Sequence, residues 1–244
     1  MPCFYSIELK ENSKIVSISG EEFHHINNVL RFKIGAQILL TNGIGILAQG
    51  NILKIEKNSL TVEINQIETK EKTYPHIALA FSLLKNKNDH LIVEKATELG
   101  VKDFFPFVSE RTIRKNSGNT LEKFRKTILS ASKQCDNAFF PQINKVNTFQ
   151  GMIDAVKKSK YLPILAYENE KNRNIWDIFP KITQSICVII GAEGGFPDAE
   201  IDIAKSEKIP IYSLGNHILR AETAAIASVS QLMNILLSQN RNHY

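Results

Sequence analysis

Cysteine is scarce in this 244-residue chain, and long apolar runs are absent. The cysteines Cys3, Cys135 and Cys187 lie far apart and form no C-x-x-C pair, so the sequence predicts neither a disulfide framework nor a zinc site. His24 and His25 have no partner histidines at ligand spacing, and we therefore expect no bound metal. Because no apolar run approaches the length of a membrane helix and the N-terminus lacks a signal-peptide pattern, we expect a cytoplasmic protein.

Two common nucleotide-binding patterns are missing as well. Gly191, Gly194 and Gly195 do not fit the spacing G-x-G-x-x-G, and they lie late in the chain rather than in an opening βαβ unit. The pattern G-x-x-x-x-G-K-[ST] occurs nowhere in the sequence. These absences disfavour a nicotinamide-dependent oxidoreductase and a phosphate loop that cleaves nucleoside triphosphates.

The net charge of +5 is concentrated in one part of the chain. Residues 1–70 contain seven basic and seven acidic side chains, whereas residues 102–145 contain nine basic and four acidic ones. A surface of this kind is suited to nucleic-acid phosphates, and a solvated helix face is the alternative. The basic side chains concerned include Arg111, Arg114, Lys115, Lys123, Arg125, Lys126 and Lys133.

The first seventy residues are patterned as short alternating strands. Turn signals at Asn42-Gly43 and Lys57-Asn58 separate these strands, as in consecutive hairpins. The pattern predicts a small β-barrel, followed by a linker over 70–75. The expected elements are a helix over 21–30 and strands over 37–41, 44–55 and 59–67.

From residue 76 onward, strands alternate with helices, which is typical of a parallel sheet. The chain is long enough for two separate cores, so we expect two domains, residues 1–72 and 73–244. Asp198 and Glu200 follow Pro197 in a pattern typical of helix initiation, and we expect them to be structural. The other expected elements of the second domain are strands over 77–84, 104–108, 143–146, 162–166, 186–190 and 211–214, and helices over 89–99, 120–135, 149–158 and 222–237.

Two glycine-rich loops near the C-terminus predict a ligand site. The loop Gly191-Ala-Glu-Gly-Gly-Phe196 follows the apolar run ICVII, which fits a strand buried on both faces of a parallel sheet. The loop Leu214-Gly-Asn-His-Ile-Leu-Arg-Ala-Glu-Thr-Ala224 follows another short strand and leads into a helix. Open α/β sheets bind ligands beyond the carboxyl ends of their strands, where glycine permits close approach to the backbone. We therefore expect both loops to line one site.

These two loops resemble those of the SPOUT (α/β-knot) methyltransferases, specifically the family of RsmE. That family has a G-P-E-G-G-F loop, followed about twenty residues later by L-G-x-R-I-L-R-x-E-T-A. In this chain Ala192 replaces the usual proline, and His217 replaces the usual first arginine.

The resemblance extends along most of the chain. His25-Ile-Asn-Asn-Val-Leu-Arg31, followed by Gly35, is similar to the family's H-x-x-x-V-L-R segment, and Glu94-Lys-Ala-Thr-Glu-Leu-Gly-Val101 is similar to its K-A-T-E-L-G-V helix. The triplet Ser109-Glu-Arg111 also fits. Where the family has E-Q-S-x-R, this chain has Lys133 and Asn137 in place of the glutamate and the arginine.

The resemblance implies an α/β fold: a C-terminal SPOUT trefoil-knot domain with a mostly parallel sheet, preceded by a small PUA-like β-barrel domain that binds RNA. It also implies a homodimer that uses S-adenosylmethionine to methylate N3 of a uridine in 16S ribosomal RNA of the small subunit. By this resemblance, the cofactor-binding residues are Gly191, Glu193, Gly194, Gly195, Leu214, Gly215, Ile218 and Leu219, and the RNA-binding residues are Arg31, Arg111, Arg114, Lys115 and Arg125.

The chemistry of uridine methylation indicates two catalytic residues. N3 carries a weakly acidic proton, so the site must favour the deprotonated base, whose charge spreads onto O2 and O4. Arg220 is expected to stabilise those oxygens or to anchor a neighbouring phosphate, and a surface ion pair with Glu222 is the alternative. Glu222 is expected to accept the proton, directly or through water, although an acid in the first turn of a helix also complements the helix dipole. Glu193 either orders its loop by accepting backbone N–H bonds or faces the substrate.

Three other functions stay open at this level. Another SPOUT enzyme would methylate the ribose 2′-hydroxyl of transfer or ribosomal RNA, but such enzymes usually carry an early N-x-x-x-x-R signature, where this chain has residues 82–89, SLLKNKND. A non-catalytic RNA-binding protein of ribosome assembly would use the barrel and the basic helix alone. A nicotinamide oxidoreductase fits the glycine spacing poorly.

Overall fold

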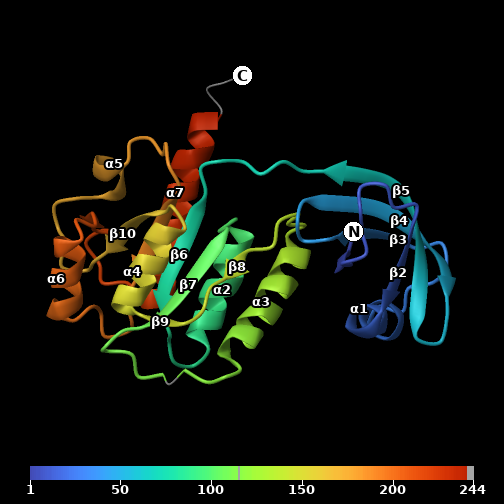
Figure 1. Cartoon of the computed structure of the whole chain (residues 1–244), viewed down its shortest axis with the longest axis horizontal. Helices are drawn as coiled ribbons and strands as arrows, with labels where there is room; N and C mark the ends of the chain where they lie inside the picture. The colour runs from blue at the N-terminus through green and yellow to red at the C-terminus, as the bar shows by residue number, and fades with distance from the viewer. Residues whose placement is uncertain (115, 241–244) are drawn as a thin grey trace. The chain divides into compact units, whose positions relative to one another are not determined.

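The computed structural model describes residues 1–114 and 116–240 and divides into two compact units (Figure 1). The first unit comprises Met1–Lys72 together with Leu129–Phe140. The second comprises Thr73–Ile128 and the chain from Pro141 onward. The division at Ile128 falls within the helix α3 (Thr120–Gln134).

The first unit is built on a curled five-stranded sheet. Strands β3 (Gln37–Thr41), β4 (Ile46–Ile55) and β5 (Ser59–Thr69) form consecutive antiparallel pairs, as their alternating apolar residues predict. Strand β1 (Cys3–Tyr5) joins β3 in parallel, and β2 (Ile15–Ser19) joins β5. Register shifts within the β4–β5 pair are irregularities that bend an antiparallel sheet. The sheet therefore curls around a core that includes Phe4, Ile38, Leu40 and Val62.

The segment Leu129–Phe140 belongs to the first unit by its contacts. The backbone N–H of Phe140 donates to the Gly43 carbonyl at 2.8 Å, and that of Gly45 donates to the Ala138 carbonyl at 2.8 Å. The Phe140 ring lies 5.4 Å from the ring of Tyr5. These contacts attach the segment to the hairpin turn between β3 and β4.

The second unit is built on a mostly parallel sheet with the strand order β12-β10-β11-β6-β7-β8. Its middle strands, β6 (Ile77–Ser82) and β11 (Ile186–Ile190), are buried at every position, as continuous apolar runs predict. All pairs along this order are parallel, so the strands end at the same edge of the sheet. The outer strands are β7 (Asp103–Val108), β8 (Gln142–Ile143), β10 (Leu162–Ala166) and β12 (Ile211–Tyr212), and β9 (Asn147–Thr148) also pairs with β7.

Helices cover both faces of this sheet (Figure 1). Helix α4 (Phe149–Lys158) packs against β7 and β10, and residues of α6 (Asp198–Ser206) join the same core cluster. Helix α7 (Ala221–Asn240) packs against β6, β11 and helix α2 (Asn88–Glu98). After β12, at the edge of the sheet, the chain therefore returns through α7 to the middle strands. Within the described residues, no helix combines the length and the apolar character needed to cross a bilayer.

Several expected elements have different bounds, and two of these differences have a local physical reason. The strand expected over 44–55 begins at Ile46, because the Asn42 side chain accepts hydrogen bonds from the backbone N–H groups of Ile44 and Ile46 and shapes a turn. The strand expected over 143–146 is two short strands, since Asn144 donates to the Phe104 carbonyl between them. The strand expected over 211–214 ends at Tyr212, and the helix expected over 21–30 is α1 (Gly20–His24) followed by a π-helical turn, His25–Val29. The elements β1, β2 and α5 (Ile175–Ile178) were not predicted from the sequence.

The packing of α7 makes a stability prediction. Leu232 on α7 is fully buried, whereas Leu237 is 56% exposed. We expect Leu232→Ala to lower the free energy of unfolding by about 2–5 kcal/mol, because the deletion leaves a cavity. Leu237→Ala, the matched control, should change it by less than about 0.5 kcal/mol. Urea denaturation followed by circular dichroism measures both, and equal losses would contradict the placement of α7.

Candidate functional site

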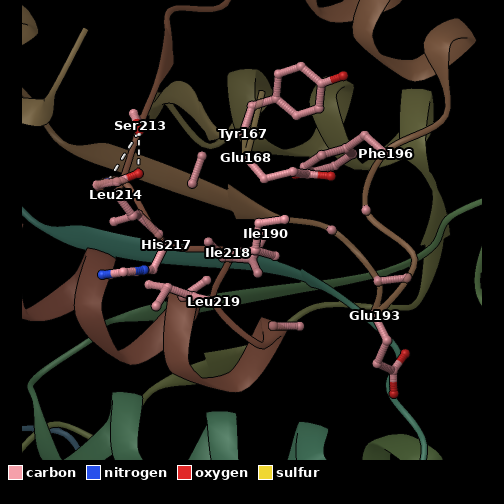
Figure 2. Close-up of a pocket in the computed structure, with 17 residues that line it drawn as sticks. Tyr167, Glu168, Ile190, Glu193, Phe196, Ser213, Leu214, His217, Ile218 and Leu219 are labelled. Atoms are coloured by element: carbon pink, nitrogen blue, oxygen red, sulfur yellow. Dashed lines mark hydrogen bonds between the residues drawn. The ribbon is translucent and has the colours of Figure 1, made fainter. Parts of the chain in front are cut away.

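The two glycine-rich loops line one cavity at the carboxyl ends of β10, β11 and β12 (Figure 2). One wall is the loop after β11, and the opposite wall is the loop between β12 and α7. Seven of the eight predicted cofactor-binding residues line this cavity, and Gly194, in the same loop, does not. The seven are Gly191, Glu193, Gly195, Leu214, Gly215, Ile218 and Leu219. The parallel sheet thus brings together loops that lie about twenty residues apart.

The loop after β11 depends on the conformation of Gly195. Its φ is +69°, in the left-handed region, and its backbone N–H donates to the Ala192 carbonyl at 2.9 Å to close a tight turn. A Cβ at Gly195 would overlap Oε1 of Glu168, the residue two positions after β10. The absence of a side chain therefore lets the loop backbone approach the β10 end, and it places the Glu168 carboxylate at the cavity.

The cavity has apolar walls and a few polar groups. Ile190, Leu214, Leu219 and Phe196 supply the apolar surface, and Ile218 is 81% exposed above it. The polar side chains are grouped at the β10 and β12 ends, where Ser213 Oγ accepts a hydrogen bond from the Gly215 backbone N–H at 3.2 Å. The lining residues outside the two expected loops, which the sequence analysis missed, are Ala166, Tyr167, Glu168, Ile190 and Ser213. The signal available for Tyr167 and Glu168 was their position directly after a buried parallel strand.

Glu193 points away from the other labelled side chains of this cavity (Figure 2). Its Oε1 accepts a hydrogen bond from the backbone N–H of Lys85, in the loop after β6, at 2.8 Å. The geometry therefore agrees with the expectation that Glu193 orders a loop by accepting a backbone N–H bond. It joins the glycine loop to a segment 108 residues away in sequence.

Arg220 and Glu222 lie at a second cavity that adjoins the first. Glu193, Ile218, Leu219 and Ala221 line both cavities, and the second is completed by Lys85, Asn86, Asn88 and Ile113. Oε2 of Glu222 is buried and has no hydrogen-bond partner among the described residues. Arg220 is exposed and forms no ion pair within that part of the chain, so the alternative of an Arg220–Glu222 ion pair is not observed.

The loop after β7 is fastened to the glycine loop. Arg111 Nη1 donates to the Gly194 carbonyl at 2.9 Å. Glu200, buried on α6, accepts hydrogen bonds from Ser109 Oγ at 2.9 Å and from the Glu110 backbone N–H at 3.1 Å. Burial raises the pKa of Glu200 above its usual value, and the two hydrogen bonds oppose that rise. Arg111 and Glu200 therefore hold the β7 loop beside the cavity.

The residues predicted to bind RNA lie in different surroundings. Arg31 belongs to the first unit and has a left-handed φ of 55°, and Arg125 is exposed on α3. Arg114 forms an ion pair with the fully buried Asp89 and lies over the Phe124 ring at 5.8 Å, so part of its charge is already neutralised. The fifth predicted residue, Lys115, lies outside the described residues.

The positions that depart from the RsmE pattern have local roles. Lys133 forms an ion pair with Glu22 at 2.6 Å inside the first unit. Asn137 Oδ1 accepts the Phe139 backbone N–H at 3.0 Å. Ala192 and His217 both line the first cavity. No group of three potential metal-ligating side chains occurs among the described residues.

The chain matches two known domain families. Residues 70–233 match the model of an RNA methyltransferase domain, and residues 18–65 match that of an RNA methyltransferase PUA domain. The chain is 34% identical to ribosomal RNA small subunit methyltransferase E of Rickettsia conorii, over 94% of this chain and 93% of that protein. It is 27% identical to the enzyme of the same name from Bacillus subtilis, over 93% of this chain and 94% of that protein.

Two solved structures resemble the whole chain. One is ribosomal RNA small subunit methyltransferase E from Neisseria gonorrhoeae bound to S-adenosyl methionine, with a TM-score of 0.87, 25% identity, and coverage of 97% of this chain and 98% of that one. The other is a methyltransferase from Legionella pneumophila in complex with the same cofactor, with a TM-score of 0.86, 26% identity, and coverage of 95% and 96%. The predicted fold class, a SPOUT domain with a mostly parallel sheet after a PUA-like domain, is confirmed.

The glycine loop makes a second prediction. Gly195→Ala should lower the free energy of unfolding by at least about 1–2 kcal/mol, because alanine is strained in the left-handed region and its Cβ would displace Glu168. Gly194→Ala is the matched control, since its Cβ would meet the Arg111 side chain at an ordinary 3.5 Å, and it should cost less than about 0.5 kcal/mol. Thermal unfolding of both variants measures the difference, and identical stabilities would refute this loop geometry.

Proposed function

Because this chain belongs to the RNA methyltransferase family that includes ribosomal RNA small subunit methyltransferase E, we propose that it methylates N3 of a specific uridine in 16S ribosomal RNA. The cofactor is S-adenosylmethionine, as in the two similar structures. The chain is thus an RNA methyltransferase, and the specific part of the proposal is the acceptor: the uridine and its N3 atom.

The first cavity fits this cofactor. Leu214, Ile218 and Leu219 provide apolar surface suited to an adenine ring, and the glycines expose backbone N–H and carbonyl groups to it. Glu168 supplies a carboxylate suited to ribose hydroxyls or to positive charge. When bound, the cofactor supplies a methyl group made electrophilic by its sulfonium. The chain's remaining tasks are to orient the acceptor base and to take up its proton.

The buried and unpartnered Oε2 of Glu222 is the observation that carries the proposal. Leaving a buried carboxylate oxygen without a hydrogen bond costs free energy. An unpartnered oxygen at a cavity therefore points to a ligand that donates a hydrogen bond to it. Glu222 lies at the second cavity, which shares four lining residues with the cofactor cavity. An acceptor base held there would place its N3–H toward Glu222, which takes the proton directly or through one water.

Arg220 completes the acceptor site. Arg220 lines the same cavity, and it forms no ion pair with Glu222 or with another described residue. An arginine remains protonated at neutral pH and offers several donors, so it stabilises the charge that develops on O2 and O4 of the base. Because a protonated arginine cannot act as a base, Glu222 accepts the N3 proton in this proposal.

The remaining parts of the proposal concern RNA binding and assembly. We assign residues 1–72 to a PUA-like RNA-binding domain and residues 73–244 to the catalytic domain. Arg31, Arg111, Arg114, Lys115 and Arg125 are proposed to contact the RNA of the small subunit. We also propose that the protein acts in the cytoplasm as a homodimer, as its family resemblance implies.

Product analysis tests the proposed acceptor. Purified protein is incubated with labelled S-adenosylmethionine and small ribosomal subunits that lack base methylation, and the RNA nucleosides are identified by mass spectrometry. We expect 3-methyluridine. A ribose-methylated nucleoside would show that the acceptor is a ribose 2′-hydroxyl and not N3. The absence of methylation on subunits, free RNA and transfer RNA would favour a non-catalytic RNA-binding protein.

Two substitutions test the assigned roles. Arg220→Ala should lower kcat by about 10²–10³, the typical effect of removing one group that stabilises developing charge. Glu222→Gln keeps the shape of the side chain but removes the base, and it should lower kcat by about 10²–10⁴. Both variants should retain the cofactor affinity of the parent, measured by calorimetry. Full methylation rates at saturating RNA and cofactor would remove these residues from the mechanism.

A further inference from the structure

A third cavity, with a volume of 740 Å³, lies in the second unit between the loop after β6 and helix α3. Leu84 forms its apolar floor, and Asn86 lies at its edge. Its other lining residues are all basic or titratable to a cation: Lys85, Lys87, His90, Arg114, Lys123 and Lys126. We refer to it as the lysine cavity. None of the residues that line it is acidic.

The lysines of this cavity carry uncompensated charge. Lys85, Lys87 and Lys123 form no ion pair among residues 1–114 and 116–240. Lys126 has only a 3.7 Å contact with Glu122, and both of these side chains are about two-thirds exposed, so screening by water leaves little net attraction. Several unpaired lysines at one concave surface attract an anion.

The buried acid beside the cavity is already neutralised. Asp89 is fully buried at the first turn of α2 and forms an ion pair with Arg114. Arg114 in turn lies over the Phe124 ring. Of this pair only Arg114 lines the cavity, and the Asp89 carboxylate, paired with it, does not balance the lysine charges.

His90 reports the same local potential. Its Nδ1 lies 3.0 Å from Thr127 Oγ1, and its ring lies 5.0 Å from that of Phe124. Burial first, and then the charges of Lys87 and Lys123, lower the pKa of His90 below its usual value. Because Thr127 Oγ1 donates to the Lys123 carbonyl at 3.1 Å, the Nδ1–H of His90 donates to Thr127, and the ring forms part of the cavity wall.

The cavity is joined to the acceptor site by the backbone. Lys85 and Asn86 line both the lysine cavity and the cavity that contains Arg220 and Glu222. Asn86 and Lys87 have φ values of 53° and 63°, a left-handed conformation that is uncommon outside glycine and that persists where surrounding contacts impose it. The hydrogen bond from the Lys85 N–H to Glu193 is one such contact. This turn therefore places the lysine cavity next to the cavity that contains Arg220 and Glu222.

We propose that the lysine cavity binds a backbone phosphate of the RNA substrate, next to the nucleotide whose base enters the acceptor site. This proposal rests on the proposed function, since the acceptor site defines which nucleotide is neighbouring. Lys87 and Lys123 hold the phosphodiester, and Lys85 connects its binding to the loop that Glu193 fixes. The contact is independent of base sequence, and it sets the register of the strand relative to Glu222.

The salt dependence of RNA binding tests this assignment. Lys87→Gln, Lys123→Gln and the double variant remove charge while keeping most of each side chain, and glutamine at position 87 keeps the Cβ that the left-handed backbone already accommodates. Lys158→Gln is the matched control, because Lys158 lies exposed at the end of α4, which lines neither cavity. The probe is a fluorescent single-stranded RNA whose dissociation constant is measured by anisotropy at several salt concentrations.

For single-stranded RNA, each phosphate contact contributes about 0.7 to the slope of log K against log[salt]. We expect the slope to fall by about 0.7 in the double variant, the contribution of one phosphate, and to stay unchanged in Lys158→Gln. Thermal shifts with S-adenosylmethionine should be the same in all variants. An unchanged slope in the double variant overturns the proposal.

A second arm separates RNA from a free anion. Inorganic phosphate is titrated at constant ionic strength while the melting temperature is followed. Stabilisation by phosphate that the double variant loses, together with an unchanged RNA slope, would assign the cavity to a free anion and overturn the proposal. The two proposals fail separately, because the slope reports binding without turnover whereas the product analysis reports the methylated atom.

Discussion

Strand β11 occupies the centre of the catalytic domain, and the site depends on its burial. It pairs in parallel with β10 on one side and with β6 on the other, and all five of its side chains are buried. Fully apolar parallel strands of this kind are stable only with helices on both faces, here α4 and α7. Because the strands share one direction, the loops after β6, β10, β11 and β12 all emerge at one edge. The three cavities described above, which these loops line, therefore follow from the order of the sheet.

Side-chain hydrogen bonds to the backbone turn these adjacent loops into one structure. Glu193 fixes the loop after β6, and Arg111 fixes the glycine loop through the Gly194 carbonyl. Glu200, on α6, fixes the loop after β7 by accepting hydrogen bonds from Ser109 and Glu110. Hydrogen bonds to charged groups are stronger than neutral ones, so three charged side chains are an effective way to hold loops that lack regular structure. The glycine loop is consequently linked to the loops after β6 and β7.

The sequence predicted best the elements whose own residues carry a clear apolar pattern. Helix α4 and strands β10 and β11 have the expected bounds, since α4 carries apolar residues at helical spacing and the two strands are short apolar runs. Strand β1 went unpredicted because three residues carry no periodicity, and only pairing with β3 makes them a strand. The convergence of the glycine loops followed from the rule for parallel strands. The partners of Glu193 and Arg114 did not, because Lys85 and Asp89 lie far from them in sequence and are brought close only by the completed fold.

Two acids at the N-termini of α2 and α7 differ in their partners. Asp89 and Glu222 each lie in the first turn of a helix, where the helix dipole favours a negative charge. Asp89 is paired with Arg114, and removing one partner of such a pair is costly, so its charge is committed to the fold. Glu222 keeps a buried oxygen without a partner, although Arg220 is only two residues away. In the mechanism we propose, the arginine contacts the substrate and the acid without a partner receives the proton.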